Sequence, residues 1–345
     1  MLSQDGQSEL LEGESGEGIE VMNISSSVSQ LPRADVLVEN DLRELRGISD
    51  EVKQKIQFLF ILAHPDDEAT HLIYIKVLQD LGFPVEILWL TFGDGSTEIE
   101  TKKAESRKVL SSIDSVKYEF LPNSVHDLTQ EAFRGSEVSR STMLKKIIQQ
   151  IRGKIQNASV VVTNAFEGGH LLHDFTHVIS RAVAEKEGKE VLEIPQYSLK
   201  TLKGICISAI HAMRHWQWGD HVLYNVGNFR EGCDQGEHLS VTADENQIKL
   251  PSKLTLTNTG VASKAGLIRL YQSQWESVFT RLLGIVEVNG TQNIECIRKA
   301  RKVPGLYSTI MHFEKIIKSW FGSMIPPRKL YEVQKEIDFL VQEDA

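Results

Sequence analysis

Cysteines and long apolar runs are scarce in this 345-residue sequence, and it carries no surplus of basic charge. Each of these shortages excludes a class of protein. The three cysteines, Cys206, Cys233 and Cys296, are widely separated and odd in number. They argue against a disulfide framework or a cysteine-rich metal site and predict a reducing compartment, the cytoplasm. No apolar run approaches the ~18–20 residues of a membrane span, and no basic-then-apolar stretch predicts a secretory signal.

The charge is acidic and unevenly distributed. The formal net charge is -9, and residues 1–50 hold eleven acidic against three basic side chains. The rest of the chain is nearly neutral, with 36 acidic and 35 basic side chains. This balance argues against a nucleic acid or an anionic membrane as partner. We expect residues 1–50 to be an acidic, flexible extension and residues 51–345 to form a single domain.

The composition is that of a globular chain, with 41% hydrophobic residues and a mean hydropathy of -0.21. Apolar runs alternate with amphipathic segments in its first half. Strands are predicted at about 57–63, 84–92, 117–121 and 157–164, and helices near 67–82, 98–113, 138–154 and 173–187. A short amphipathic helix is also predicted within 40–56. This alternation is typical of an α/β fold with a mostly parallel sheet, helices on both faces and a site at the carboxyl ends of the strands.

The pattern is less regular after residue 190. An apolar strand is predicted at 204–210, and indoles and imidazoles follow it between His211 and His221. Such side chains could stack on a sugar ring, or they could simply anchor a surface loop. The polar stretch 230–252 predicts a loop. A long helix is predicted from about Ser263 onward, in a C-terminal part that is largely helical.

The stretch His64-Pro65-Asp66-Asp67-Glu68 links the first predicted strand to the following helix. Pro65 suits the first helical position, and acidic residues in a first turn complement the helix dipole. That explanation leaves out the imidazole of His64 and the repulsion among three consecutive acids. A bound cation accounts for both. A histidine at the strand end and an acid three residues later can converge on one point, which leaves the other aspartate free as a base.

A second group of imidazoles follows the fourth predicted strand, between Asn164 and Asp174. The carboxyl end of that strand should lie at the same edge of the sheet as His64, so His170 or His173 could supply a third ligand. A single histidine is more often a structural residue than a ligand. The pattern His173-Asp174-Phe-Thr-His177 also imitates the HExxH motif of zinc proteases, with Asp in place of Glu, and offers a competing zinc site.

Taken together, the two motifs resemble the GlcNAc-phosphatidylinositol de-N-acetylase (PIG-L/LmbE-like) family. They are His64-Pro65-Asp66-Asp67-Glu68 and Glu167-Gly168-Gly169-His170-Leu-Leu-His173-Asp174. Tyr271-Gln-Ser273-Gln274 is similar to the family's Tyr-x-Ser-Gln segment. The resemblance covers about residues 57–285. It implies a Rossmann-like fold and metal-dependent removal of an acetyl group from an N-acetylated amine, usually of an amino sugar.

The resemblance also implies roles for single residues. His64, Asp67 and His173 would hold Zn²⁺, or Fe²⁺, and no further cofactor is implied. Asp66 would be the general base, and His170 would act as general acid or oxyanion partner. The expected partner is an N-acetylated sugar or sugar conjugate. Two alternatives stay open, a catalytically silent carbohydrate-binding protein on the same fold and a zinc hydrolase that uses His173 and His177.

Overall fold

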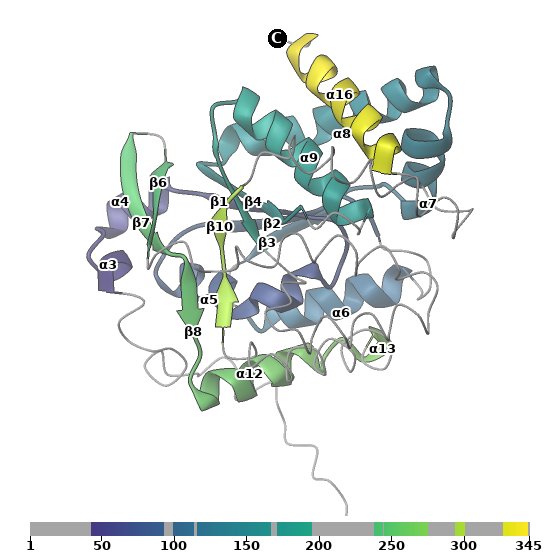
Figure 1. Ribbon diagram of the computed structural model, residues 1–345. Helices are drawn as coiled ribbons and strands as arrows, with labels where there is room; N and C mark the ends of the chain where they lie inside the picture. The colour runs from purple at the N-terminus through teal and green to yellow at the C-terminus, as the bar shows by residue number, and fades with distance from the viewer. Residues whose placement is uncertain are drawn as a thin grey trace, which may run out of the picture.

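A six-stranded, mostly parallel sheet forms the centre of the molecule (Figure 1). The computed structural model describes residues 43–92, 99–113, 116–166, 171–194, 238–243, 245–274, 294–300 and 327–343. The strands of the sheet are β1 (Phe58–Leu62), β2 (Val85–Trp89), β3 (Lys117–Phe120), β4 (Val160–Asn164), β5 (Glu190–Ile194) and β10 (Arg298–Lys299). Their order is β10-β5-β4-β1-β2-β3, and only β10 runs antiparallel to its neighbour. This order is Rossmann-like and confirms the predicted fold class.

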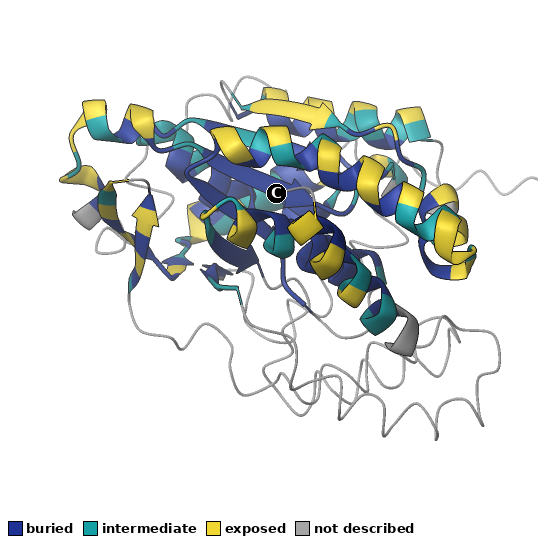
Figure 2. Cartoon of the chain, turned by 90° about the horizontal axis from the view of Figure 1, so that it is seen from above, coloured by how far each residue is buried: buried dark blue, intermediate teal, exposed yellow. Residues whose placement is uncertain are grey.

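The central strands are apolar on both faces because helices cover both faces. All five residues of β1 are buried, and the inner strands are dark blue in Figure 2. Phe58 and Phe60 pack into the core on one face, whereas Leu59 and Ile61 pack into the core on the other. Each such side chain stabilises the fold by about 1.5–3 kcal/mol. A continuous apolar run is therefore what a central parallel strand requires.

Helices form a layer on each side of the sheet (Figure 1). One layer contains α5 (Leu72–Asp80), α6 (Ile99–Ser111) and α12 (Asn258–Ile268). The other contains α8 (Glu137–Asn157), α9 (Leu171–Lys186) and α16 (Pro327–Glu343), next to α7 (Val125–Leu128) and the π-helix η3 (Thr129–Arg134). Along the described parts of the chain, no helix combines the length and the apolar content that crossing a bilayer needs.

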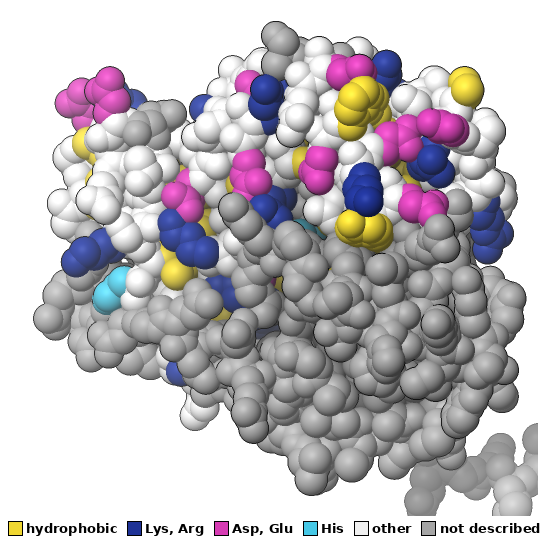
Figure 3. All heavy atoms as spheres, turned by 45° about the horizontal axis from the view of Figure 1, so that its top comes forward, with side chains coloured by type: hydrophobic (Ala, Val, Ile, Leu, Met, Phe, Trp, Pro, Cys, Tyr) yellow, Lys and Arg dark blue, Asp and Glu magenta, His cyan; other side chains and the backbone are white. Residues whose placement is uncertain are grey.

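The face formed over α8, α9 and α16 carries acidic and basic side chains side by side (Figure 3). Several of them are paired. Arg140 Nε lies 2.5 Å from Glu336 Oε2, and Arg181 Nη2 lies 2.8 Å from Glu185 Oε1. This face therefore has no surplus of one sign that would attract a highly charged partner.

The helix predicted within 40–56 is two short helices, α3 (Arg43–Arg46) and α4 (Asp50–Lys55). The helix is interrupted because Ser49 takes an extended conformation and caps α4, with the Val52 N–H donating to its Oγ at 3.4 Å.

The prediction of a loop over 230–252 is wrong for the part that the structure describes. There β6 (His238–Ala243) and β7 (Asn246–Pro251) form an antiparallel hairpin. Leu239, Val241 and Ile248 point into the core, and polar residues alternate with them. Only one face of the hairpin is buried, so its average polarity is high although its period of two is that of a strand.

Where the structure describes it, the C-terminal part is also less helical than predicted. Helix α12 ends at Ile268, and Tyr271 lies in the connection to the short helix α13 (Gln272–Gln274). Strands β8 (Lys253–Thr255) and β9 (Ile294–Cys296) pair with each other. The strand predicted at 204–210 and the aromatic cluster between His211 and His221 lie outside the described residues. Cys296 is disulfide-bonded.

Strand β9 is hydrogen-bonded to the start of α5, although more than 200 residues separate the two elements in the sequence. Glu295 accepts hydrogen bonds from the Ile73 and Tyr74 N–H groups at 3.3 and 2.6 Å, and Lys264 Nζ lies 2.7 Å from the same carboxylate. These N–H groups belong to the first turn of α5, which has no side-chain cap of its own. The distant carboxylate therefore caps the helix that follows the HPDDE motif.

His71 is buried in the same contact, and we expect it to make folding sensitive to acid. Its Nε2 donates to the Cys296 carbonyl at 2.7 Å. Burial, followed by the charge of Lys264, lowers the pKa of His71 to about 3. Below about pH 6.5, His71 is therefore protonated in the unfolded chain but stays neutral in the folded chain. The free energy of unfolding falls as the pH falls from 6.5 towards 3.

Through His71 the protein should lose roughly 2–3 kcal/mol of unfolding free energy between pH 6.5 and 4.5. His71→Gln keeps a donor for the Cys296 carbonyl but cannot be protonated. Between pH 6.5 and 4.5 the variant should therefore lose roughly 2–3 kcal/mol less unfolding free energy than the wild type. Urea unfolding of both proteins at the two pH values measures the difference. Equal losses in the two proteins would contradict the assignment.

Candidate metal centre

The residues of the two motifs meet where the strand order reverses. Strands β1 and β4 are neighbours in the sheet, and the chain proceeds outward from them in opposite directions. His64 follows β1, Asp67 begins the 3-10 helix η2 (Asp67–His71), and His173 lies in the first turn of α9. Ligand atoms of these three residues all lie within 4.8 Å of one another. Ligands of open α/β sheets bind at this kind of position.

The carboxylate of Asp67 is fixed through one of its oxygens. Asp67 Oδ2 accepts from the N–H groups of Ala63 and His64, at 2.9 and 3.2 Å, and from Asn164 Nδ2 at 3.1 Å. Asp67 Oδ1 faces the two imidazoles instead, 3.2 Å from His64 Nδ1 and 3.1 Å from His173 Nε2. Three donors thus hold the side chain and leave its second oxygen directed at the centre of the group.

The electrostatics of the group favour a charged carboxylate. Burial alone would raise the pKa of Asp67, but His173 and His64 lower it well below its usual range. Burial would lower the pKa of His64, and Asp67 and Asp66 outweigh it and raise that pKa. His173 and Asp67 are almost fully buried. Two imidazoles and one carboxylate are a common donor set for a divalent ion such as Zn²⁺, and this group can hold one.

Asp66 lies beside this group but is not a member of it. Its Oδ1 is 2.8 Å from His64 Nδ1. Burial raises the pKa of the Asp66 carboxyl, although His64 opposes the shift. A carboxylate with a raised proton affinity, next to a metal site and not in it, suits a general base.

The backbone at Asp66 corrects the predicted start of the helix. Its φ of 112° is the one positive value among the described non-glycine residues. The first helical residue is therefore Asp67, and Pro65 stands in a turn before it instead of at the first helical position. A left-handed conformation costs an L-residue roughly 1–2 kcal/mol, and Asp tolerates it better than most residues. Such strain is characteristic of functional sites.

Two other predicted residues are not part of the group. His170 lies outside the described residues, so its role stays a prediction. His177 is one turn along α9 from His173, but its Nδ1 faces the Asn164 carbonyl at 3.0 Å and Glu193 Oε2 at 3.5 Å. The described part of the chain thus brings His173 together with His64 and Asp67, and it gives no support to a zinc site made of His173 and His177.

Sequence reasoning missed Asn164, the last residue of β4. Its Oδ1 accepts from the Ala63 N–H at 2.9 Å, so it bridges the ends of β1 and β4 while its amide holds Asp67. Its position could have indicated this role, because Asn164 is a polar residue at the end of an apolar strand that pairs with β1. Groups that orient a metal ligand in this way contribute to metal affinity without touching the ion.

Asn164→Ala should therefore weaken metal binding about 10–100-fold, measured by competition with a chelator of known affinity. Asn123→Ala is a matched control, since Asn123 is equally buried and bonds to the Leu90 carbonyl and Gln150 instead of the metal group. Both variants should lose stability, and only the first should lose metal affinity. An unchanged affinity in Asn164→Ala would show that Asn164 does not orient Asp67.

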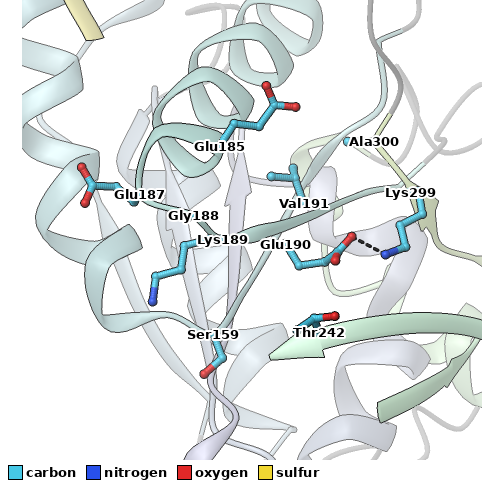
Figure 4. Close-up of a pocket in the computed structure, with 10 residues that line it drawn as sticks. All are labelled: Ser159, Glu185, Glu187, Gly188, Lys189, Glu190, Val191, Thr242, Lys299 and Ala300. Atoms are coloured by element: carbon cyan, nitrogen blue, oxygen red, sulfur yellow. Dashed lines mark hydrogen bonds and ion pairs between the residues drawn. The ribbon is translucent and has the colours of Figure 1, made fainter. Parts of the chain in front are cut away.

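A pocket at the other end of the sheet is distinct from this centre (Figure 4). It lies at the amino ends of β4 and β5, where Ser159, Lys189 and Glu190 contribute to its wall. Glu190 is paired there with Lys299 of β10. The pocket holds none of the residues that the two motifs predicted, so the chemistry lies elsewhere.

Comparison with known proteins is consistent with this placement. Residues 59–184 match the family model described as GlcNAc-PI de-N-acetylase, PIG-L. This span includes all but the first residue of β1, the whole of β4 and all three potential metal ligands. A search of curated protein sequences gave no match.

Solved structures similar to this chain include two deacetylases. The zinc-inhibited form of the teicoplanin deacetylase Orf2 is 13% identical, with a TM-score of 0.45 over 72% of this chain and 100% of that one. N,N'-diacetylchitobiose deacetylase from Pyrococcus horikoshii is 17% identical, with a TM-score of 0.37 over 80% of this chain and 96% of that one.

The family match confirms the predicted N-deacetylase class, and the group of potential ligands lies at the carboxyl ends of β1 and β4, where the motifs placed it. Through residues 59–184, the chain is therefore similar to the GlcNAc-PI de-N-acetylase (PIG-L) family.

Proposed function

We propose that the protein removes the acetyl group from an N-acetylated amino sugar or sugar conjugate by metal-dependent hydrolysis. The observation that carries this proposal is the group of His64, Asp67 and His173 with the Asp66 carboxylate beside it. Hydrolysis of an unactivated amide needs a polarised carbonyl, a base for the attacking water and a proton for the leaving amine. The chain offers a residue for each of these requirements.

His64, Asp67 and His173 would hold the ion, and a zinc-type ion in such a site lowers the pKa of water and polarises a carbonyl. Asp66 would take a proton from the attacking water, a role that its raised pKa favours. His170 would stabilise the oxyanion or return a proton to the departing amine, as the motif suggests.

We further propose that residues 51–345 act as one domain, with the acidic residues 1–50 outside it. The contacts of Glu295 with α5 support this, because they join a late strand to the segment that carries the metal ligands. A cytoplasmic location stays a prediction from the scattered cysteines. The disulfide at Cys296 counts against it, since disulfides are rare in that compartment.

A metal analysis coupled to an acetate-release screen tests the proposed function. The full chain would be assayed with free N-acetylglucosamine, its oligomers, a nucleotide-linked form and N-acetylglucosaminyl phosphatidylinositol, after loading with Zn²⁺ or Fe²⁺. We expect about one ion per chain, with free amine formed in step with acetate on at least one substrate. Metal binding with no turnover on any of them would favour the silent carbohydrate-binding alternative.

A further inference from the structure

Glu68, the last residue of the HPDDE motif, faces away from the metal group. Its side chain is fully buried and is not a member of the group of potential ligands. Its carboxylate instead receives three hydrogen bonds. Tyr271 Oη donates to Oε1 at 2.6 Å, and Trp89 Nε1 and the Asp66 N–H both donate to Oε2 at 3.0 Å. A buried carboxylate is stable only when it is bonded in this way.

The bond from the Asp66 N–H matters because of the conformation of Asp66. A left-handed aspartate persists only where its surroundings hold it. The Ala69 N–H donates to the Asp66 carbonyl at 2.9 Å, and Glu68 holds the N–H of the same residue. The peptide groups on both sides of Asp66 are therefore fixed, and with them the direction in which its side chain leaves the backbone.

Glu68 is held in turn by two distant elements. Trp89 is the last residue of β2, and Tyr271, which follows the end of α12, lies 203 positions after Glu68 in the sequence. The segment after Tyr271 is anchored too, since the N–H and Oγ of Ser273 both donate to Glu105 of α6, at 2.7 and 2.6 Å. Both aromatic residues are fully buried, so neither competes with solvent for its bond to Glu68.

We propose that Glu68 is a positioning residue, which holds Asp66 in its left-handed conformation and is itself held by Trp89 and Tyr271. Its role in catalysis rests on the proposed function, in which Asp66 is the base. In this arrangement β2 and the segment after α12 fix the base without touching substrate or metal. Loss of the arrangement should lower kcat and leave KM and metal binding largely unchanged, because a displaced base affects mainly the chemical step.

Three variants test the proposal. Glu68→Leu removes both acceptors and should lower kcat about a hundredfold. Glu68→Gln keeps an acceptor at the same reach and should recover most of that loss. Tyr271→Phe removes one bond to a charged group and should lower kcat about tenfold. Each should bind about one Zn²⁺ per chain at saturation, with KM within about twofold of the wild type.

Tyr74→Phe is the matched control. Tyr74 is equally buried and donates one hydrogen bond, to the Pro251 carbonyl at 2.9 Å, with no contact to Glu68. It should match Tyr271→Phe in lost stability and keep the wild-type kcat. Equal kcat in the two tyrosine variants would overturn the proposal. Loss of the metal ion in Glu68→Gln would also overturn it, because Glu68 would then be a ligand.

Nuclear magnetic resonance separates failure of this inference from failure of the proposed function. In protein labelled with ¹⁵N at aspartate and tryptophan, we expect the Asp66 amide and the Trp89 indole N–H to exchange slowly with water. Both should exchange faster in Glu68→Leu and stay protected in Glu68→Gln. A wild-type protein without deacetylase activity would refute the function and leave this result standing. Unchanged exchange in Glu68→Leu would refute the role of Glu68 even in an active enzyme.

Discussion

His173→Ala is expected to remove the bound metal ion and, with it, measurable acetate release. His173 supplies one of the three potential ligand atoms, and its Nε2 lies 3.1 Å from Asp67 Oδ1. The variant leaves His64 and Asp67, too few ligands for a stable site. Because removing a group that only orients a ligand weakens binding about 10–100-fold, removing a ligand should weaken it by more than about a hundredfold. Metal content after dialysis against a weak chelator measures the loss.

His177→Ala is the matched control for this result. Both histidines are fully buried on α9, so both variants leave a cavity of similar size. His177 bonds to the Asn164 carbonyl and lies near Glu193, away from the ligand atoms. This variant should therefore lose stability and keep its metal ion. Metal loss in both variants would instead support the zinc site that uses His173 and His177.

The parallel half of the fold could be predicted because its signals are local. An apolar run such as that of β1 needs burial on both faces, and the amphipathic segments between the strands have the period of helices. The site followed from the same logic. His64 and His173 stand after two different strands, and the carboxyl ends of parallel strands meet at one edge. In the structure His173 Nε2 lies 3.1 Å from Asp67 Oδ1, so the residues that follow the two strands are close together, as expected.

The features that could not be predicted depend on contacts between distant parts of the chain. Glu295 capping α5 and Tyr271 bonding Glu68 each join residues more than 200 positions apart, and such pairings leave no period in the sequence. The left-handed backbone of Asp66 is of the same kind. The hydrogen bond from the Asp66 N–H to Glu68 stabilises this conformation, and Glu68 is held by Trp89 and Tyr271. Because these partners lie outside the motif, the HPDDE sequence alone suggested an ordinary helix start.

Asp66→Asn is expected to lower kcat by about 10²–10⁴ while the metal ion stays bound. Asparagine has nearly the same shape and adopts the left-handed conformation readily. It cannot take a proton from water. Because Asp66 is outside the group of potential ligands, its replacement removes the base and spares the site. Single-turnover acetate release and metal analysis of one preparation measure both effects.

For the neighbouring variant Asp67→Asn we expect loss of the metal ion to be the primary effect, whereas Asp66→Asn should lose kcat and keep the ion. Asp67 Oδ1, which faces the two imidazoles, is a potential ligand atom, and Oδ2 already accepts three hydrogen bonds. Asparagine there removes the charge that attracts the ion and places an NH₂ group either against those donors or against the metal. Metal should therefore be lost first and activity only as a consequence, with partial recovery at high Zn²⁺. Recovery of Asp66→Asn by added metal would assign Asp66 to the ligands, and full activity in that variant would leave the proton transfer to another group.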